Sequence, residues 1–413
     1  MSGNLRVVTP SDDPPRAEGI AISRLRTLIQ DSHLNLLIGA GTSAPYFALL
    51  GQVEDAMTEL SGNDDASRIA RSSVQAYFFR KVLQPNLSLL DPKSDPAAVD
   101  LIKSYARFIG VLNQILLKRR STELSKQVNL FTTNVDMASE VALEWLEVAT
   151  NDGFSGKMKP RLDLGEYSTL RYRQGVRYEY RSEIPTVNLF KIHGSVAWDK
   201  VGDEIYFDHS MNAVRLVLEA LEPAQRHLIP IESDADVDVA ALRKAAEGKT
   251  YSAEIQYFSD AYSKLQIVNP EKTKFASTVL NKTYYELIRR FTNELEKESC
   301  VLLVHGFSFA DEHLRDLITR AAATNPTLQI VIFCFNRKSF DSISAYFPNE
   351  RVKNGNVLFV RPVGAEEDEA EHVLSLDNFV SDWLEPILEE KPKPADQILE
   401  LRLGEGKDSD YDA

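Results

Sequence analysis

A glycine-rich segment follows the first strand-like apolar run of the chain, and its residue types suit contact with phosphate. Residues 34–38 form a short run that is apolar except for Asn35, and Gly39, Gly41 and Ala44 then fit the spacing G-x-G-x-x-A. Directly after a strand, this spacing lets backbone N–H groups approach a pyrophosphate, with Gly39 forming a tight turn and Gly41 leaving space for phosphate oxygens. The alternative is a strand-to-loop turn without a ligand. No acidic residue ends a second strand at the distance typical of an ordinary dehydrogenase, which disfavours that class.

Small polar residues follow the next apolar run, residues 127–132. Thr133, Asn134 and Asp136 stand where hydrogen-bonding groups could hold a ribose or a carboxamide, because ligands of open parallel sheets bind at the carboxyl ends of the strands. Thr, Asn and Asp are also good helix N-caps, and we expect a helix from about Met137 to Thr150. A purely structural role for these residues therefore stays open.

A histidine follows the third apolar run, residues 187–192. His193 precedes Gly194, which places its ring at the edge of the predicted sheet. Histidine is the side chain best suited to proton transfer near neutral pH, so His193 is a candidate general base. A structural or merely exposed histidine is the alternative.

Two further apolar runs end in the same way. Gly306, Phe307 and Ser308 come shortly after residues 300–304, and Asn336 follows the run that ends at residue 335. A helix is expected to begin near Asp311, which would serve as its N-cap. Five strands would thus deliver glycine or small polar groups to one edge, as a dinucleotide requires.

The elements that must position these residues are short apolar strands that alternate with helices. This alternation predicts an α/β fold: a Rossmann-like, doubly wound, mostly parallel sheet with helical and irregular insertions. Residues 251–262 are aromatic and have no clear assignment. The expected organisation is a flexible arm at 1–19, one domain over 20–390 with insertions at about 65–125, 151–186 and 201–268, and an acidic tail at 391–413.

Composition excludes several classes of protein. The chain has 413 residues, a net charge of −14 and two cysteines, Cys300 and Cys334. Two cysteines supply neither a disulfide framework nor a four-cysteine zinc site. No apolar run approaches the roughly 20 residues of a membrane span, and no signal-peptide core is present, so we expect a cytoplasmic protein. The negative charge disfavours direct nucleic-acid binding, and the basic run at 118–120 is expected to be a charged helix end.

The order of these motifs resembles the NAD pocket of the sirtuin fold. Gly-Ala-Gly-Thr-Ser, Thr-Thr-Asn-Val-Asp, Lys-Ile-His-Gly-Ser, Gly-Phe-Ser and Phe-Asn follow one another over roughly residues 30–340. Together with residues 269–287 and 306–313, the set is similar to the bacterial sirtuin-like NADases of antiphage defence, above all those encoded beside a HerA-type hexameric ATPase.

The resemblance implies a role for each residue. Asn134 would orient the nicotinamide ribose or an attacking water, Asp136 would bind the carboxamide, and His193 would be the general base. Thr133 stands beside Asn134 and joins the NAD-binding set. The phosphates would contact Gly39, Ala40, Gly41, Thr42 and Ser43, and the adenosine half would face Gly306, Phe307, Ser308 and Asn336.

Two departures from the sirtuin pattern narrow the expected activity. Sirtuin deacylases have a glutamine where this chain has Thr133, and they have a zinc module of four cysteines, so we expect a sirtuin-like fold without zinc and without a metal site. Cleavage of NAD⁺ as substrate needs only the pocket. The expected function is therefore an NAD⁺ hydrolase that releases nicotinamide and ADP-ribose.

Other functions remain open on the sequence alone. They are a non-enzymatic module that senses NAD⁺ or ADP-ribose, a zinc-independent deacylase or ADP-ribosyltransferase, and a plain scaffold. A constitutive NADase would kill its host, so we expect gating. The resemblance implies a homo-oligomer and a HerA-type ATPase ring as partners.

Overall fold

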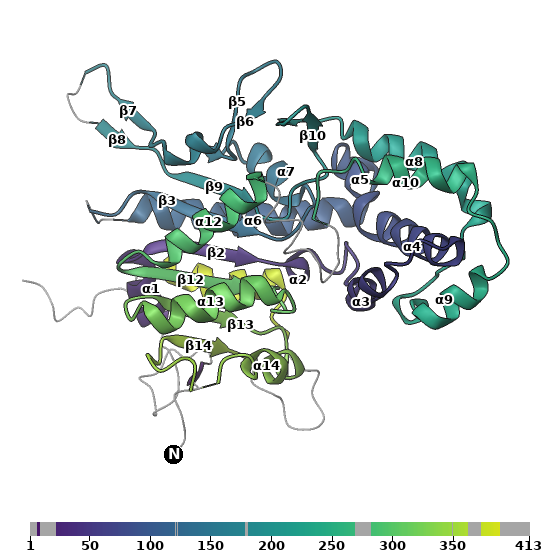
Figure 1. Ribbon diagram of the computed structural model, residues 1–413. Coiled ribbons are helices and arrows are strands. Elements are labelled where there is room, and N and C mark those ends of the chain that lie inside the picture. Colours follow the sequence, from purple (N-terminus) through teal and green to yellow (C-terminus); the bar gives the residue numbers. More distant parts are fainter. Residues whose placement is uncertain are drawn as a thin grey trace, which may run out of the picture.

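The computed structural model describes residues 6–8, 22–119, 121, 123–177, 181–268, 282–348, 350–361 and 373–388. The predicted acidic tail at 391–413 lies outside these residues, as does most of the predicted arm at 1–19. The described part is an α/β fold in which helices cover both faces of a central parallel sheet (Figure 1). The predicted fold class is thereby confirmed.

The central sheet has eight strands, and every neighbouring pair is parallel. In spatial order the strands are β1 (Arg6–Val8), β14 (Val357–Val360), β13 (Gln329–Phe333), β12 (Cys300–His305), β2 (His33–Ile38), β3 (Gln127–Thr132), β9 (Thr186–Lys191) and β4 (Thr150–Asn151). The chain proceeds from β2 through β3 to β9 on one side, and later from β12 through β13 to β14 on the other. The direction of winding thus reverses between β2 and β12, which is where doubly wound sheets bind their ligands.

Each face of the sheet packs against its own set of helices, which explains why the strands are apolar without alternation. One face contacts α12 (Lys282–Leu295), α13 (Glu312–Thr324) and α14 (Arg337–Ser344). The opposite face contacts α1 (Ile22–Gln30), α6 (Pro96–Lys118), α7 (Ala138–Trp145) and a C-terminal helical run of α15 (Leu376–Phe379), η6 (Val380–Leu384) and α16 (Glu385–Leu388). In Figure 1, α12 and α13 lie across β2 and β12.

Helices inserted between the strands form a separate group. After β2 come α2 (Ala40–Ser43), α3 (Gly51–Glu59), α4 (Asp65–Phe78), η1 (Phe79–Leu83), α5 (Asn86–Leu89) and η2 (Pro92–Ser94), and after β9 come α8 (Asn212–Ala224), η4 (Gln225–His227), η5 (Asp234–Asp236), α9 (Val239–Ala246) and α10 (Ala253–Tyr262). A small core joins α3, α4 and α9. In Figure 1 this helical group lies beyond the carboxyl end of β2.

Short strands occupy the other irregular segments. They form a four-stranded sheet of β10 (Trp198–Val201), β11 (Glu204–Phe207), β6 (Arg161–Leu162) and β5 (Phe154–Ser155), and a hairpin of β7 (Tyr172–Gln174) and β8 (Arg181–Glu183). The short helix η3 (Leu164–Ser168) lies between β6 and β7. No helix of the described residues has the length and apolar character that crossing a membrane requires.

Two local expectations differ from the structure. Arg6–Val8, inside the predicted flexible arm, pairs with β14 as an edge strand. The helix expected over residues 137–150 ends at Trp145, because Glu147 adopts a φ of 52°, a left-handed conformation that terminates helices. The expectation of a charged helix end is confirmed, because α6 ends at Lys118 and Arg119 is its C-cap. Arg119 is nevertheless buried and donates to the carbonyls of Ile29 and Ser32.

Candidate functional site

Two glycine-containing loops cross at the point where the winding of the sheet reverses. The Gly39 N–H donates to the His305 carbonyl at 3.1 Å, and the Gly41 N–H donates to the Gly306 carbonyl at 2.9 Å. A Cβ on Gly39 would lie 2.6 Å from the Gly306 oxygen. Gly306 itself has a φ of 65°, and its Cβ would lie 2.3 Å from the Thr42 nitrogen. The loop after β2 and the loop after β12 therefore pack backbone to backbone.

This contact gives the glycine pattern a physical reason that differs from the predicted one. A tight turn begins at Gly39, where the Thr42 N–H donates to the Gly39 carbonyl at 2.9 Å, but Gly39 itself has a φ of −120° that other residues can adopt. The space expected for phosphate beside Gly41 is bordered by the Gly306 backbone. The following helix, α2, is only four residues long. Glycine is required here chiefly because two loops approach closely.

The hydroxyl of Thr42 points into the protein. It lies 3.0 Å from Nδ1 of His305, whose Nε2 lies 3.2 Å from the Leu374 carbonyl. Because a carbonyl only accepts, Nε2 carries the proton, and the Thr42 hydroxyl has two acceptors in reach, Nδ1 and the His305 carbonyl at 3.1 Å. Burial lowers the pKa of His305 to about 4. This neutral histidine ties the glycine loop to the segment that precedes α15.

The hydroxyl of Ser43 is the centre of a buried hydrogen-bonded cluster. It lies 2.6 Å from the Tyr105 hydroxyl of α6, 3.0 Å from Oδ2 of Asp136 and 3.0 Å from Nδ2 of Asn134. Burial, followed by the charge of Asp136, raises the pKa of Tyr105 well above its usual value. The structure thus brings together three residues that the sequence placed in one site, and it adds Tyr105.

Asn134 has an acceptor without a partner. The residue is only 7% exposed, and its Oδ1 makes no hydrogen bond among the described residues. Its backbone N–H donates to Thr132 Oγ1, and its side-chain Nδ2 donates to the Ser43 hydroxyl. A buried unpaired acceptor is costly, and it fits a ligand that supplies a donor such as a hydroxyl group.

Asp136 supports the start of α7 from one position before Met137, which is the N-cap. Its Oδ1 accepts from the Ala138 N–H at 3.0 Å, at the start of α7. The Lys191 ammonium donates to the backbone carbonyl of Asp136 and lies 3.1 Å from Glu140. Burial raises the pKa of the Glu140 carboxyl despite this pairing. The cluster therefore rests on a buried ion pair that the sequence analysis did not identify.

His193 lies at the same edge and contacts a carboxylate at the start of α13. Its Nε2 is 3.2 Å from Oδ2 of Asp311, and both side chains are 13% exposed. Asp311 caps α13 through its Oδ1, which accepts from the backbone N–H groups of His313 and Leu314. The predicted N-cap is confirmed, and Asp311 also becomes a residue that orients the candidate base.

The remaining predicted residues occupy the rims of the same loops. Ala40 and Ser308 are exposed, Thr133 is half-buried, and Phe307 packs edge-on against Phe309 within the core. Asn336 caps α14, where its side-chain oxygen accepts from the Ser339 N–H. The side chains of Phe307 and Asn336 are thus engaged within the protein.

Strand order explains why these loops meet. β13, β12, β2, β3 and β9, which carry the five predicted motifs, are consecutive neighbours in the sheet. Tyr105 and Asp311 complete the arrangement from α6 and from the start of α13. Neither had a sequence signal for this role, because each acts through a partner more than 60 positions away in the chain.

The site holds hydrogen-bonding groups and two imidazoles, of which His305 is buried and His193 is partly exposed. No group of three His, Cys, Asp or Glu side chains within the described ranges has the arrangement of a metal site. Cys300 and Cys334 are both buried, and burial raises the pKa of each thiol to about 12. The chemistry available is acid–base catalysis and hydrogen bonding to a polar substrate.

A cavity of about 250 Å³ lies elsewhere, at the amino ends of the strands, so the candidate site is defined by converging side chains and not by that cavity.

Comparison with known proteins adds no relative: no family model matches the chain, and no curated protein is detectably similar to it.

Proposed function

We propose that this chain cleaves NAD⁺ at the nicotinamide–ribose bond and hydrolyses it to nicotinamide and ADP-ribose. The observation that carries the proposal is the buried, unpartnered Oδ1 of Asn134, held in place by Ser43 at the edge where His193 also lies. A ribose hydroxyl or a water molecule is the kind of donor that this acceptor fits.

The reaction divides between two side chains. Asn134 accepts a hydrogen bond from the attacking water or from a ribose hydroxyl, and His193 takes the proton that the water loses. The water oxygen bonds to C1′ while the C1′–nitrogen bond breaks, and nicotinamide leaves as a neutral molecule. The leaving group is cationic before cleavage and needs no acid, although the transition state resembles that of glycoside hydrolysis.

We propose a direction of binding that rests on the topology of the sheet. The pyrophosphate would lie over the loops of Gly39 and Gly306, where the winding reverses. The Thr42 and Ser43 hydroxyls are bonded within the protein, and the N–H groups of Gly39, Gly41 and Thr42 donate to backbone carbonyls. Phosphate contacts would therefore come from other N–H groups of these loops. The nicotinamide ribose would then lie toward Asn134 and His193, and the adenosine half toward Ser308 and Asn336.

The biological setting is a proposal that rests on the order of the motifs. We propose that the chain acts in the cytoplasm as an effector of antiphage defence that depletes NAD⁺. Assembly into a homo-oligomer and docking on a HerA-type ATPase ring would gate it.

Product analysis tests the activity. The purified chain is incubated with NAD⁺, alone and with a HerA-type ATPase, and the products are separated by liquid chromatography. We expect equal amounts of nicotinamide and ADP-ribose, and His193→Ala should reduce their release by about 10²–10⁴-fold. Tight binding of ADP-ribose without any nicotinamide release would instead favour a sensing module.

A further inference from the structure

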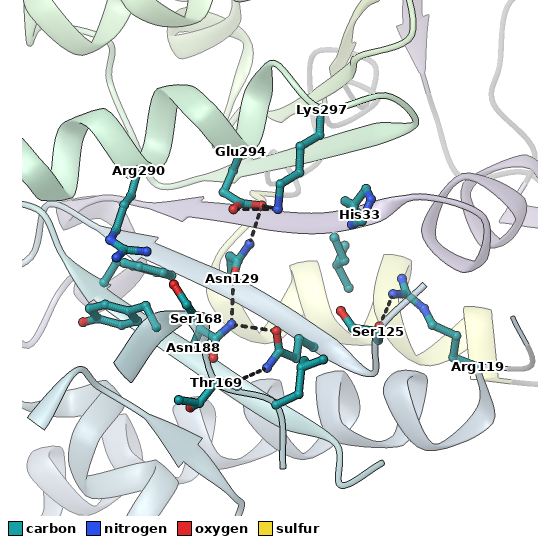
Figure 2. Close-up of a pocket in the computed structure, with 15 residues that line it drawn as sticks. His33, Arg119, Ser125, Asn129, Ser168, Thr169, Asn188, Arg290, Glu294 and Lys297 are labelled. Carbon is teal, nitrogen blue, oxygen red and sulfur yellow. Dashed lines mark hydrogen bonds and ion pairs between the residues drawn. The ribbon is translucent and has the colours of Figure 1, made fainter. Parts of the chain in front are cut away.

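The cavity of about 250 Å³ opens at the amino ends of β2, β3 and β9, at the opposite edge of the sheet from the candidate active site (Figure 2). Its walls come from these strands, from residues 167–170 and from α12 with the turn that follows. Figure 2 shows that polar side chains from each of these elements line it.

A row of asparagines crosses the sheet beside this cavity. Asn35, Asn129, Asn188 and Asn151 occupy matching positions on β2, β3, β9 and β4. Asn129 donates to Asn35 at 2.8 Å, and Asn188 donates to Asn129 at 2.9 Å. The amides therefore satisfy one another along the row.

One acceptor in this row is left over at the cavity wall. Oδ1 of Asn188 makes no hydrogen bond within the described part of the chain, and the residue is 2% exposed. Since the amide nitrogen is fixed by Asn129 and Gln127, the oxygen has a defined direction. A bound molecule with a hydroxyl group would supply the missing donor.

The cavity is cationic, although the chain carries a net charge of −14. Arg290, Arg119 and Lys297 line it with a single carboxylate, Glu294, which lies 2.7 Å from Lys297. Burial, assisted by the charge of Lys297, lowers the pKa of His33, so that ring is neutral near pH 7. The balance of charge favours an anionic ligand.

Arg290 is the best-placed cation for such a ligand. One guanidinium nitrogen, Nη2, donates to the Leu164 carbonyl at 2.6 Å, which fixes the group against η3. Its Nε is buried and has no partner in the ranges that the structure describes. Nε of Arg119, which also lines the cavity, is likewise buried without a partner in those ranges, so the lining includes two unpaired donors on cations and one unpaired acceptor on an amide.

The volume limits the size of the ligand. At about 250 Å³ the cavity is smaller than the range of roughly 300–1,000 Å³ typical of sites for drug-sized molecules. A dinucleotide is far too large for it. A ligand of a few carbons with one anionic group and several hydroxyls matches both the volume and the unpaired groups.

We propose that this cavity is a second ligand site, which binds a sugar monophosphate with its phosphate on Arg290 and a hydroxyl on Oδ1 of Asn188. This site is separate from the proposed NAD⁺ site and does not depend on that function. Charge-assisted hydrogen bonds to phosphate are stronger than neutral ones, so Arg290 supplies most of the affinity.

Isothermal titration calorimetry with ribose 5-phosphate tests the proposal on the full chain. We expect saturable binding that Arg290→Gln weakens roughly ten- to hundredfold, the loss expected for a hydrogen bond to a charged group. Arg289→Gln is the matched control, because Arg289 is the neighbouring arginine of α12, is exposed and pairs with Glu286. Its affinity should equal that of the parent.

Separate probes test the two halves of the ligand. Inorganic phosphate and ribose should each bind much more weakly than ribose 5-phosphate, and Asn188→Val should weaken binding of the sugar phosphate while circular dichroism shows an intact fold. Phosphate that binds as tightly as ribose 5-phosphate would overturn the hydroxyl contact. No saturable binding, or equal affinity in Arg290→Gln, would overturn the site. Calorimetry needs no turnover, so its result is independent of NAD⁺ cleavage.

Discussion

Nε2 of His193 lies 3.2 Å from Oδ2 of Asp311, although β9 and β12, the strands before these residues, are separated in the sheet by β2 and β3. The contact spans the carboxyl ends of both intervening strands. Asp311 only accepts, so Nε2 carries the proton and Nδ1 is the basic nitrogen of the ring. The helix cap at α13 thereby sets the tautomer of the candidate base.

Asp311→Asn should lower NAD⁺ turnover by about tenfold or more, the loss expected for one hydrogen bond to a charged group. Asparagine also caps helices well, so the fold should persist. Initial rates of nicotinamide release measure the effect. Asp238→Asn is the control, since Asp238 caps α9 in the same way. Equal losses in both variants would show that capping, and not orientation of His193, is responsible.

Asn134→Ala should reduce nicotinamide release by about 10²-fold, because the fixed amide that contacts the reacting ribose or water is removed. The loss of activity should appear as a lower kcat. The melting temperature of the variant should stay close to that of the parent. Asn212→Ala, at the exposed start of α8, serves as the control. Release at the parental rate in Asn134→Ala would remove this residue from the mechanism.

Gly306→Ala should destabilise the chain more than Gly202→Ala, although both glycines have nearly the same φ, 65° and 64°. At Gly202 an added Cβ meets nothing within 4 Å, so only the left-handed backbone costs free energy, about 1–2 kcal/mol. At Gly306 the Cβ would collide with Thr42, which should add about 1–3 kcal/mol. Urea denaturation of the two variants measures the difference, and equal free energies of unfolding would contradict close packing of the loops.

Stability should fall between pH 7 and pH 5 by about 2 kcal/mol on account of His305. Its pKa is lowered from 6.5 to about 4 in the folded chain, so the unfolded chain takes up the proton first as the pH falls. The contribution of neutral His305 to the free energy of unfolding is complete above pH 6.5 and is lost as the pH falls toward 4. Urea denaturation at the two pH values measures it.

His305→Gln provides the comparison for this pH dependence. Its amide keeps a donor for the Leu374 carbonyl and does not titrate in this range. The difference between pH 7 and pH 5 should therefore shrink by about 2 kcal/mol in the variant. An unchanged difference would mean that other groups cause the loss.

The strands could be predicted closely from the sequence. The predicted run 127–132 is β3 as observed, and the predicted runs 34–38, 187–192 and 300–304 agree with β2, β9 and β12 to within one residue at each end. These strands are buried on both faces, so continuous apolar runs bounded by glycine or polar residues mark them. Their common edge follows from parallel pairing, which also brought Ser43, Asn134 and Asp136 together.

Other features depend on tertiary contacts that no local pattern records. Tyr105 lies on an amphipathic helix with nothing to distinguish its hydroxyl, and Asp311 had the signal of an N-cap alone. The aromatic stretch that became α10 had no clear period, because only three of its residues, Ile255, Phe258 and Tyr262, are buried. The glycine spacing predicted that the backbone approaches a pyrophosphate closely. In the structure the same backbone approaches the loop of Gly306.

The N-terminal strand β1 protects its neighbour from other molecules. Arg6–Val8 pairs in parallel with β14 and occupies the backbone groups along one side of that strand. Deleting residues 1–19 would leave Leu358–Val360 with an unpaired row of N–H and C=O groups, next to strands that are apolar. Such open edges recruit strands from other chains. A truncation chosen to remove a supposedly dispensable arm would therefore produce a protein prone to aggregation.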